Sequence, residues 1–499
     1  MTAPSAIAAT AGGGLLTLSI LLPALGVLLS LLAGGRRAER IAFVLMPVQL
    51  AVAIAIAALV WRSGQPLVYN LAGYAPPLGI GLRADGFSAV MLVTSALIAP
   101  AAGLFARVNF ATPSGEEKRA PLVFWTLLQG LQAALSLIFL GGDLFNLYVG
   151  LELLTFAAVP LVSLDGRPET VAAALRYLLF ALFGSAFYLL GVALLYGVYG
   201  TLDIALLASQ IRPEPAVWLA AGLMTAGLLA KTALFPLHLW LPPAHANAPA
   251  AASAVLSGLV VKGSFFLVVR LWFDVLAGLP AVVPGVILAA LGSAAILFGS
   301  ALALRQERLK LLIAYSTVAQ IGYLFLMFPL SHGPWAADAF SGGIMQALSH
   351  AFAKAAMFLS AGLIAESLGH DRIGGLGGAG RAMPMTFLAL GLGGLSLMGL
   401  PPSGGFAAKW LLMKVSIEAG QWFWALVMAA GGLLAGGYLY RVLAPALSGE
   451  GAQLKKAPER SREGVALALA LVAVLLAFAP PGFFAFLQIG RPVVGVALQ

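Results

Sequence analysis

The sequence predicts an all-α protein that is embedded in a membrane and crosses it many times. Of its 499 residues, 61% are hydrophobic and 9% are charged, whereas a typical soluble domain has about 25% charged residues. The hydrophobic residues also form long stretches, and a membrane-spanning helix needs about 20 of them in succession. The 58 glycines agree with this class, because small residues let membrane helices pack closely.

Fourteen stretches have the length and apolar character of a membrane-spanning helix. The first is expected to be retained, because no basic residue precedes Arg36 to form the charged start of a cleavable signal peptide. The segment 65–85 is too polar and too broken by proline to span, so we expect an extracytoplasmic hairpin or surface loop there. The predicted spans are 14–34, 41–61, 86–107, 121–141, 143–164, 171–199, 216–240, 250–273, 281–304, 311–330, 340–364, 385–413, 421–443 and 464–487.

Basic residues are distributed unevenly between the loops on the two sides of the membrane. An even number of spans places both termini on one side, so alternate loops can be compared. Cytoplasmic loops are rich in lysine and arginine, which puts both termini on the extracytoplasmic side of the cell's inner (plasma) membrane. The cytoplasmic set contains Arg36, Arg37, Arg40, Arg107, Lys118, Arg119, Arg167, Arg305, Arg308, Lys310, Arg372, Arg381, Arg441, Lys455, Lys456, Arg460 and Arg462, and the other set little beyond Arg62, Arg83, Arg212, Arg270, Lys414 and Arg491.

The composition also excludes several kinds of site. The chain has no cysteine, which rules out disulfides, thiolate metal sites and iron–sulfur clusters. Its five histidines are too few and too scattered for a haem or zinc site. We therefore expect no cofactor and no metal ion in this chain. The net charge of +9 is explained by the basic loops, so no nucleic-acid partner is expected.

Six ionisable residues lie inside five of the predicted spans, where a charge costs about 2.5–3.5 kcal/mol on insertion scales. One such residue alone could be a packed, internally paired side chain. A series of them indicates a proton relay, because a buried lysine near a carboxylate can load and release a proton. His350 and Lys354 are four residues apart and so share one helix face. The six residues are Glu152, Lys231, Lys262, His350, Lys354 and Lys409.

Two of these lysines stand beside proline. Pro236 follows Lys231 in the seventh span, and Pro401 and Pro402 precede Lys409 in the twelfth. Proline removes a backbone donor and clashes with the preceding turn, so both helices should be interrupted within the membrane. Interrupted helices at matching positions of two halves are typical of transporters built from internal repeats. We expect two inverted five-helix repeats, spans four to eight and nine to thirteen.

This pattern divides the chain into four regions. Residues 1–120 hold the first three spans and the hairpin, and 121–280 and 281–445 hold the two repeats. Residues 446–499 hold a linker and the last span, and the charged run 455–463 within them is expected to be a solvated linker or a lipid-headgroup contact.

Five motifs resemble those of the antiporter-like subunits of respiratory complex I. That family includes the large subunits of Mrp-type sodium/proton antiporters and of energy-converting hydrogenases. The likeness covers roughly residues 80–445. The motifs are KTALFPLHLWLPPAHANAPAAASAVLSGLVVKGSFFLVVR (231–270), YGTLDIA (199–205), LKLLIAYSTVAQIGY (309–323), HAFAKAAMFLSAG (350–362) and GLPPSGGFAAKW (399–410).

The resemblance implies a role for each of the six residues. Glu152 and Lys231 would form the ion pair of the uptake half-channel, and Lys262 would be the central relay lysine. His350 and Lys354 would follow, and Lys409 would be the terminal site that leads outward.

The chain departs from the family pattern at several positions. Arg308 stands where an aspartate is usual, Leu311 where a basic residue is usual, and Pro243 where an acid is common. Arg176 replaces a frequent lysine, and its guanidinium cannot release a proton. Lysine rather than glutamate at position 409 argues against the middle subunit of complex I. The length of the chain and the segment GDLFNLYV favour an Mrp D-type subunit or its hydrogenase or complex-I-like relatives.

These features lead to a functional expectation with alternatives. The first is a proton-translocating subunit that works with other membrane subunits in an Mrp-type antiporter or a complex-I-like complex. The alternative is a membrane subunit of an NADH:quinone oxidoreductase or hydrogenase whose pumping is driven by redox chemistry in partner subunits; a purely supporting scaffold is the third. Whether the assembly is an enzyme, and whether sodium moves as well as protons, is left open, as is the role of His238 and His245.

Overall fold

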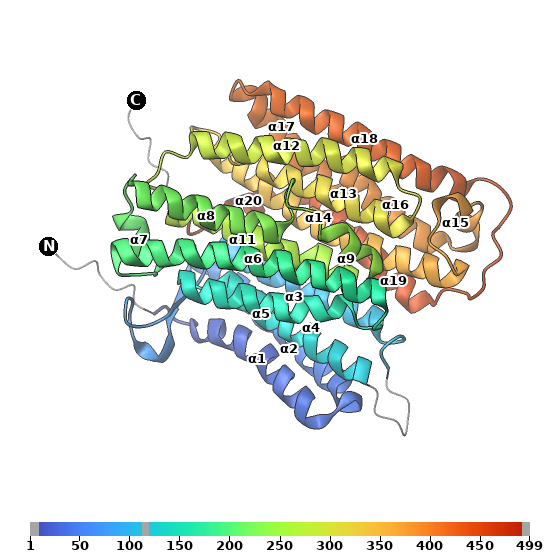
Figure 1. Ribbon diagram of the computed structural model, residues 1–499, viewed down its shortest axis with the longest axis horizontal. Coiled ribbons are helices and arrows are strands. Elements are labelled where there is room, and N and C mark those ends of the chain that lie inside the picture. The colour runs from blue at the N-terminus through green and yellow to red at the C-terminus, as the bar shows by residue number, and fades with distance from the viewer. Residues whose placement is uncertain (1–8, 112–118, 492–499) are drawn as a thin grey trace.

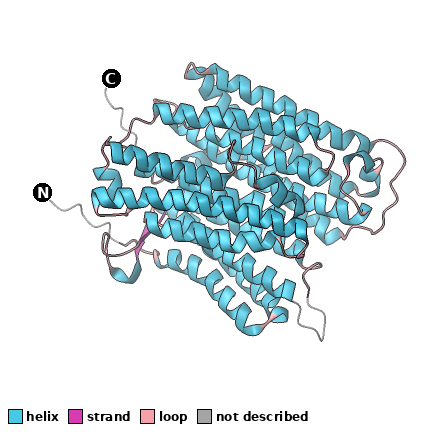
Figure 2. Ribbon diagram, in the orientation of Figure 1, coloured by secondary structure: helices cyan, strands magenta, loops and turns pink. Residues whose placement is uncertain are grey.

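The computed structural model describes residues 9–111 and 119–491. The chain folds almost entirely into helices that run roughly parallel to one another, horizontally in Figure 1. Strands are confined to a small patch near one end of the helices, as Figure 2 shows. The predicted all-α membrane architecture is confirmed.

Within the described residues, twelve helices are long and apolar enough to cross a membrane. Two shorter apolar helices, α13 (Leu309–Phe325) and α16 (Pro384–Met398), fall in the tenth and twelfth predicted spans, so the total of fourteen spans stays a prediction. The twelve are α1 (Gly14–Ala33), α2 (Gly35–Ser63), α3 (Gly86–Ala106), α4 (Arg119–Leu140), α5 (Leu144–Val162), α6 (Pro168–Tyr199), α8 (Pro215–Thr232), the continuous helix Ala250–Val275, α12 (Val282–Arg305), α14 (Ala336–Leu368), α18 (Trp422–Leu447) and Arg460–Phe478, which begins with α19 (Arg460–Leu475).

The remaining helices are short and connect or extend the long ones. They are α7 (Ile204–Gln210), α9 (Leu241–Asn247), α15 (Ala379–Ala382), α17 (Gly404–Glu418) and α20 (Pro481–Leu487). The continuous helix Ala250–Val275 consists of α10 (Ala250–Val255), a π-helical turn, α11 (Val261–Arg270) and a second π-helical turn (Leu271–Val275).

The segment between α2 and α3 forms the expected hairpin. Strands β1 (Leu67–Asn70) and β2 (Gly81–Ala84) pair antiparallel. Near the start of the described chain, the Thr10 amide donates to the Val68 carbonyl at 2.9 Å. Near its end, Arg83 donates to the Gly490 carbonyl. Both ends of the described chain therefore lie against the hairpin, on the left in Figure 1.

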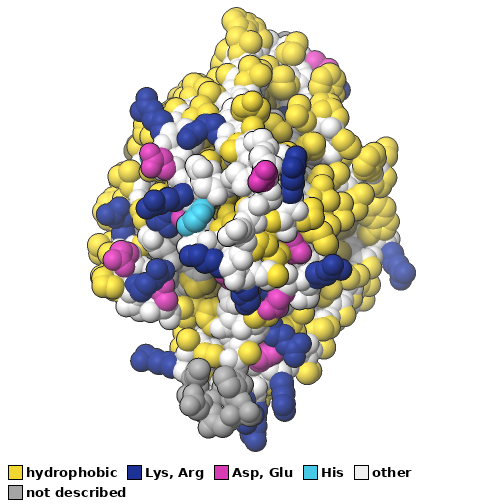
Figure 3. All heavy atoms as spheres, turned by 90° about the vertical axis from the view of Figure 1, so that its right-hand side faces the viewer, with side chains coloured by type: hydrophobic (Ala, Val, Ile, Leu, Met, Phe, Trp, Pro, Cys, Tyr) yellow, Lys and Arg dark blue, Asp and Glu magenta, His cyan; other side chains and the backbone are white. Residues whose placement is uncertain are grey.

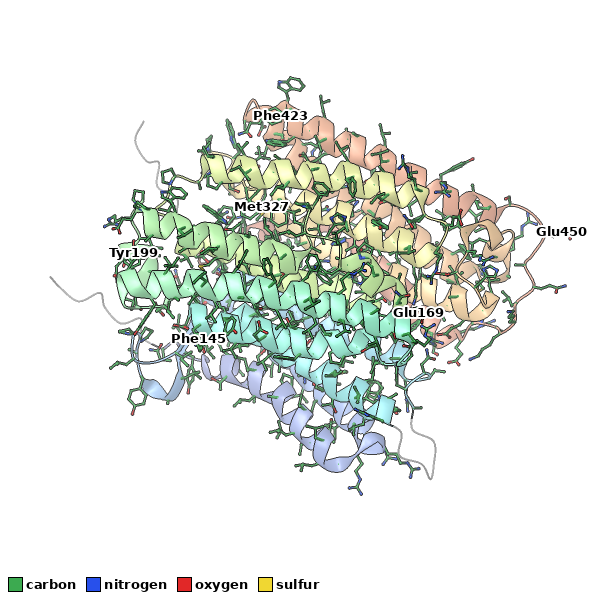
Figure 4. All side chains as sticks on the ribbon, viewed as in Figure 1. Phe145, Glu169, Tyr199, Met327, Phe423 and Glu450 are labelled. Atoms are coloured by element: carbon green, nitrogen blue, oxygen red, sulfur yellow. The ribbon has the colours of Figure 1, made fainter. Side chains whose placement is uncertain are left out.

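The opposite end of the molecule is the basic one. Figure 4 labels Tyr199 at the left and Glu169 at the right, so α6 runs the length of the bundle between the two ends. Figure 3 looks onto the right-hand end, where many lysine and arginine side chains are spread among fewer acidic ones. This is the distribution that the positive-inside rule attributes to a cytoplasmic face.

Two helices form the centre of the bundle. Their apolar windows in Ala250–Val275 and in α14 are buried throughout, and α10 packs directly against α14. The outer helices α1, α6 and α18 instead expose large apolar side chains such as Leu21, Phe183 and Leu433. Such a surface fits contact with lipid or with helices of another subunit. The two central helices are shielded from the lipid by these outer helices.

Both expected helix interruptions are present. α8 ends at Thr232, where Ala233 adopts a left-handed backbone conformation (φ 58°), and helical structure resumes at α9. α16 ends at Met398 and is followed by Gly399 in a left-handed conformation (φ 81°), and α17 begins after Ser403, whose hydroxyl accepts the Phe406 amide hydrogen. Trp240 Nε1 donates to the Ala230 carbonyl at 2.9 Å, so a side chain adds a hydrogen bond to the last turn before the first interruption.

Candidate functional site

Glu152 on α5 and Lys231 in the last turn of α8 form a loose ion pair. Lys231 Nζ lies 3.8 Å from Glu152 Oε1, and the two side chains are 6% and 15% exposed. The ammonium donates at 2.8 Å to Thr155 Oγ1 and at 3.3 Å to the Leu151 carbonyl. Within the described residues Glu152 Oε1 accepts no hydrogen bond. The lysine is thus held by neutral oxygens, and the pair can open without breaking a direct hydrogen bond between its two members.

Lys262 lies at the centre of the buried helix Ala250–Val275 and is fully buried. Its ammonium donates to the Ser257 carbonyl, within the π-helical turn that precedes α11. The hydroxyls of Ser257 and Thr317 are 3.1 Å apart, which connects this helix to α13. Among the described residues no carboxylate forms an ion pair with Lys262.

His350 and Lys354 both project from α14 and are buried. Lys354 Nζ donates to the Ile313 carbonyl at 2.9 Å and to Ser316 Oγ at 2.5 Å, both on α13. Neither ring nitrogen of His350 has a hydrogen-bond partner in the described part of the chain. Buried polar groups are nearly always paired, and exceptions are found at functional sites.

Lys409 borders the second helix interruption, on α17. Its ammonium donates at 2.6 Å to the Leu397 carbonyl and at 3.3 Å to the Met398 carbonyl, so it caps the last turn of α16. A positive charge at the C-terminal end of a helix is favourable, because the free carbonyls there carry partial negative charge. The same ammonium lies 4.1 Å from the centre of the Tyr323 ring.

A single turn of α13 connects the three deepest lysines. Thr317 contacts Ser257 beside Lys262, and Ser316 accepts from Lys354. Gln320 Nε2 donates at 3.1 Å to the Leu397 carbonyl, the same oxygen that accepts from Lys409. The structure therefore does not bring these lysines into direct contact with one another. It joins them through short polar side chains on one helix.

Four residues of this network were missed from the sequence. They are Thr155, Ser257, Gln320 and Gln346, whose Nε2 donates to Gln320 Oε1 at 3.0 Å. Gln346 lies one turn before His350 on α14, and amide side chains are unusual inside apolar spans. That spacing is a signal which could have identified it.

The two histidines whose role was left open are both buried. His245 on α9 is fully buried, stacks on Phe358 at 5.1 Å between ring centres, and has no partner for either nitrogen among the described residues. His238 is buried against Phe235 and Phe298. Arg176, in contrast, is exposed on the outer face of α6.

One expectation about charged residues was wrong. The run 455–463 is not a solvated linker over its whole length, because Arg462 and Glu463 at the start of α19 are buried. Arg462 donates to both carboxylate oxygens of Glu366 on α14, at 2.6 and 2.9 Å. Glu463 accepts from the Thr386 hydroxyl at 2.7 Å. These contacts fasten α19 to α14 and to α16 instead.

Comparison with known proteins gives one consistent result. Residues 141–435 match the family described as NADH:quinone oxidoreductase/Mrp antiporter, TM. The chain is 36% identical to the N-type subunit of NADH-quinone oxidoreductase from Desulforudis audaxviator, over 82% of this chain and 79% of that protein. It is 30% identical to the D-type subunit of the Na(+)/H(+) antiporter from Alkalihalophilus pseudofirmus, over 77% and 76%.

Solved structures give the same picture. A chain of the Mrp complex from Dietzia sp. superimposes with a TM-score of 0.87 at 26% identity, covering 97% of this chain and 99% of that one. A chain of the membrane-bound sulfane sulfur reductase, an archaeal respiratory membrane complex, superimposes with a TM-score of 0.86 at 26% identity, covering 95% and 96%. A chain of respiratory complex I from Thermus thermophilus, at 24% identity, has the same fold with a TM-score of 0.73, covering 93% of this chain and 96% of that one.

Proposed function

Because the chain belongs to the NADH:quinone oxidoreductase/Mrp antiporter transmembrane family, we propose that it is a proton-translocating antiporter-like subunit. The observation that carries this proposal is the row of three deeply buried lysines, Lys262, Lys354 and Lys409, each held by neutral oxygens and joined to the next through α13. A lysine held this way has no fixed negative partner that locks its proton in place. The proposed relay is Glu152, Lys231, Lys262, His350, Lys354 and Lys409.

The proposed mechanism uses charge to pass protons between groups that do not touch. When the Glu152–Lys231 pair closes, the carboxylate stabilises the proton on Lys231; when it opens, the uncompensated charges act on Lys262. In a low-dielectric interior such an interaction reaches well beyond contact distance. Protons would then move through Lys354 towards Lys409, with hydroxyls and amides of α13 orienting the groups between them.

The same proposal covers placement and partners. The basic end in Figure 3 would face the cytoplasm, and both termini would lie on the extracytoplasmic side of the plasma membrane. The chain would work with other membrane subunits, since the similar solved chains come from multisubunit membrane complexes. If that complex is an oxidoreductase, redox chemistry would take place in partner subunits.

The proposed division of the chain has four regions, 1–120, 121–280, 281–445 and 446–499. Of these, 121–280 and 281–445 are proposed to be inverted repeats.

Replacing Lys262 by methionine tests the relay at its centre. Methionine has a similar length without a proton-carrying group, so we expect driven proton transport to slow by about tenfold or more, which corresponds to about 1.4 kcal/mol of barrier. Transport would be measured with a pH-sensitive dye in vesicles that carry the complete complex. Lys414→Met is the matched control, because Lys414 is exposed on α17 and pairs with Asp338 and Glu418. Unchanged transport by assembled Lys262→Met would refute the proposal.

Replacing Gln320 by leucine tests the connecting turn of α13. The leucine removes the donor to the Leu397 carbonyl and the acceptor for Gln346 but keeps similar bulk. We expect assembly to persist and the transport rate to fall a few-fold, since the groups beside Lys409 lose their orientation. Gln65→Leu, in an exposed loop, should transport at the wild-type rate. Equal rates for the two variants would remove Gln320 from the pathway.

A further inference from the structure

A second buried charge cluster lies outside the proposed relay, at the hairpin end of the bundle. Arg270, at the end of α11, donates to both carboxylate oxygens of Asp85 at 2.6 Å. It also donates to Asp274 at 2.7 Å and to the Ser88 hydroxyl at 2.9 Å. The side chains of Arg270, Asp85 and Asp274 are 12%, 2% and 8% exposed. The cluster thus fixes one guanidinium with two carboxylates from two different parts of the chain.

Arg270 of this cluster lies on the same helix as Lys262, the lysine at the centre of the proposed relay. Lys262, Phe266 and Arg270 are spaced four residues apart on α11, so they follow one another along one face of the helix. The rise from Lys262 to Arg270 is about 12 Å, since an α-helix advances about 1.5 Å per residue. Beyond Arg270 lies a partly open cavity of about 100 Å³, lined by Arg83, Asp203, Arg270 and Asp274 among others. The helix face therefore leads directly from Lys262 to the outer side of the protein.

Aromatic rings occupy the space between Lys262 and Arg270 along this helix face. The Phe266 ring is stacked on Phe87 at 4.6 Å and lies against Phe139 at 5.0 Å. The Arg270 guanidinium lies over the Phe266 ring at 4.8 Å from its centre. Phe266 and Phe87 are 1% and 2% exposed. This layer offers no donor or acceptor side chain along the direct line.

The cluster of Arg270, Asp85 and Asp274, like the aromatic rings, does not carry a proton. A guanidinium has five N–H donors and no acceptor, and it stays charged in proteins. A proton passing along hydrogen bonds needs groups that both accept and donate. Burial by itself would raise the pKa of the Asp85 carboxyl, but Arg270 and then Arg83 outweigh it and lower the pKa to about 2. Asp85 therefore stays ionised and does not take up protons at physiological pH.

We propose that Phe87, Phe266, Arg270, Asp85 and Asp274 form an outer plug that separates the outer cavity from Lys262. This inference rests on the proposed function and adds a direction to it. A proton on Lys262 is barred from leaving along this helix face, and a proton in the outer cavity is barred from reaching Lys262 along it. It must move sideways through α13 and α14 towards Lys409. A fixed arginine that excludes protons is a known physical device in membrane pores.

The test measures passive proton leak and not driven transport. Vesicles carrying the complete complex receive an imposed pH gradient with no driving ion or substrate, and a pH-sensitive dye follows its decay. Arg270→Gln removes the charge but keeps a polar side chain of similar reach. We expect the gradient to decay about tenfold faster, the change that a barrier lower by about 1.4 kcal/mol produces. Adding Lys262→Met to Arg270→Gln should return the decay to the wild-type rate.

Arg212→Gln is the matched control, because Arg212 is exposed just beyond the end of α7 and lies outside the plug. It should leak no faster than the wild type. Wild-type decay in assembled Arg270→Gln vesicles, or a leak that persists when Lys262 is also replaced, would overturn the proposal. If Arg270→Gln does not reach the membrane, Phe266→Ala decides, since it opens the aromatic layer and leaves the ion cluster intact; an unchanged decay then overturns it.

Failure of the plug and failure of the proposed function give different results. The plug is judged from passive decay alone. The relay is judged from driven transport by Lys262→Met in an otherwise unchanged chain. A cluster that only anchors α3 to the helix Ala250–Val275 would lower the amount of assembled complex in Arg270→Gln without changing the leak per assembled complex.

Discussion

Vesicles that carry Lys231→Ala are expected to show no transport above background, although the complex still assembles. Alanine removes the group that takes the proton in the uptake half of the path, and it leaves Glu152 without its partner at 3.8 Å. The contacts to Thr155 and Leu151 disappear as well. Glu152→Ala should have the same result, because the lysine then loses the carboxylate that switches its charge.

The measurement is driven proton transport at matched amounts of assembled complex. Lys414→Ala and Glu418→Ala are matched controls, since these two residues pair with each other at 3.8 Å on the exposed face of α17. The double variant Glu152→Ala/Lys231→Ala should be no worse than either single variant, because residues that act as one unit are not additive. Normal pumping by assembled single variants would contradict the proposed relay.

Lys409 gives the second large effect and separates two roles by the order of its variants. Lys409→Arg should nearly abolish transport, because arginine can replace the contacts to the Leu397 and Met398 carbonyls but cannot release its proton. Lys409→Glu should keep part of the activity, because a carboxyl group can load and unload a proton. It should not reach the wild-type rate, since an ionised glutamate cannot donate to these carbonyls and is repelled by the helix end.

A lysine that only caps α16 predicts the opposite order. Arginine would then be tolerated, and glutamate would disrupt the interruption between α16 and α17. Transport and the amount of assembled complex, measured for both variants at equal expression, decide between the two. A fully active Lys409→Arg variant would remove Lys409 from the proton path.

Much of the fold was predictable because hydropathy acts locally. The predicted span 14–34 matches α1 (Gly14–Ala33), and 86–107 matches α3 (Gly86–Ala106). In lipid every backbone group must be satisfied inside its own segment, so helix positions follow from the length of the apolar run. The two interruptions were also predictable from local sequence, because proline disfavours the helical turn before it, and α8 and α16 end shortly before Pro236 and Pro401.

The site was predictable as a set of residues but not as a connected path. The cost of a charge in the membrane identified Lys262, Lys354 and Lys409 from their positions inside apolar spans. Their link through Ser316, Thr317 and Gln320 was not visible, because these small polar side chains are ordinary in sequence and gain meaning from what lies opposite them.

The contacts of charged residues near the ends of the spans could not be predicted from the sequence either. Arg270 was assigned to the sparsely basic side and Arg462 to a solvated run, yet both are buried with carboxylates from distant parts of the chain. Asp85 is 185 residues from Arg270, and Glu366 is 96 residues from Arg462. Partners so far apart leave no local pattern.

The sequence by itself determined that this protein is a bundle of membrane helices with two interruptions and a buried series of ionisable groups. Those properties depend on the free energy of placing each residue in lipid, which is set residue by residue. Only the tertiary structure decided which oxygen each lysine contacts, that one turn of α13 connects three of them, and that Arg270 closes the direct way out from Lys262. Those properties depend on which helices pack side by side, and packing between helices is determined by shape and polar contacts across the whole chain.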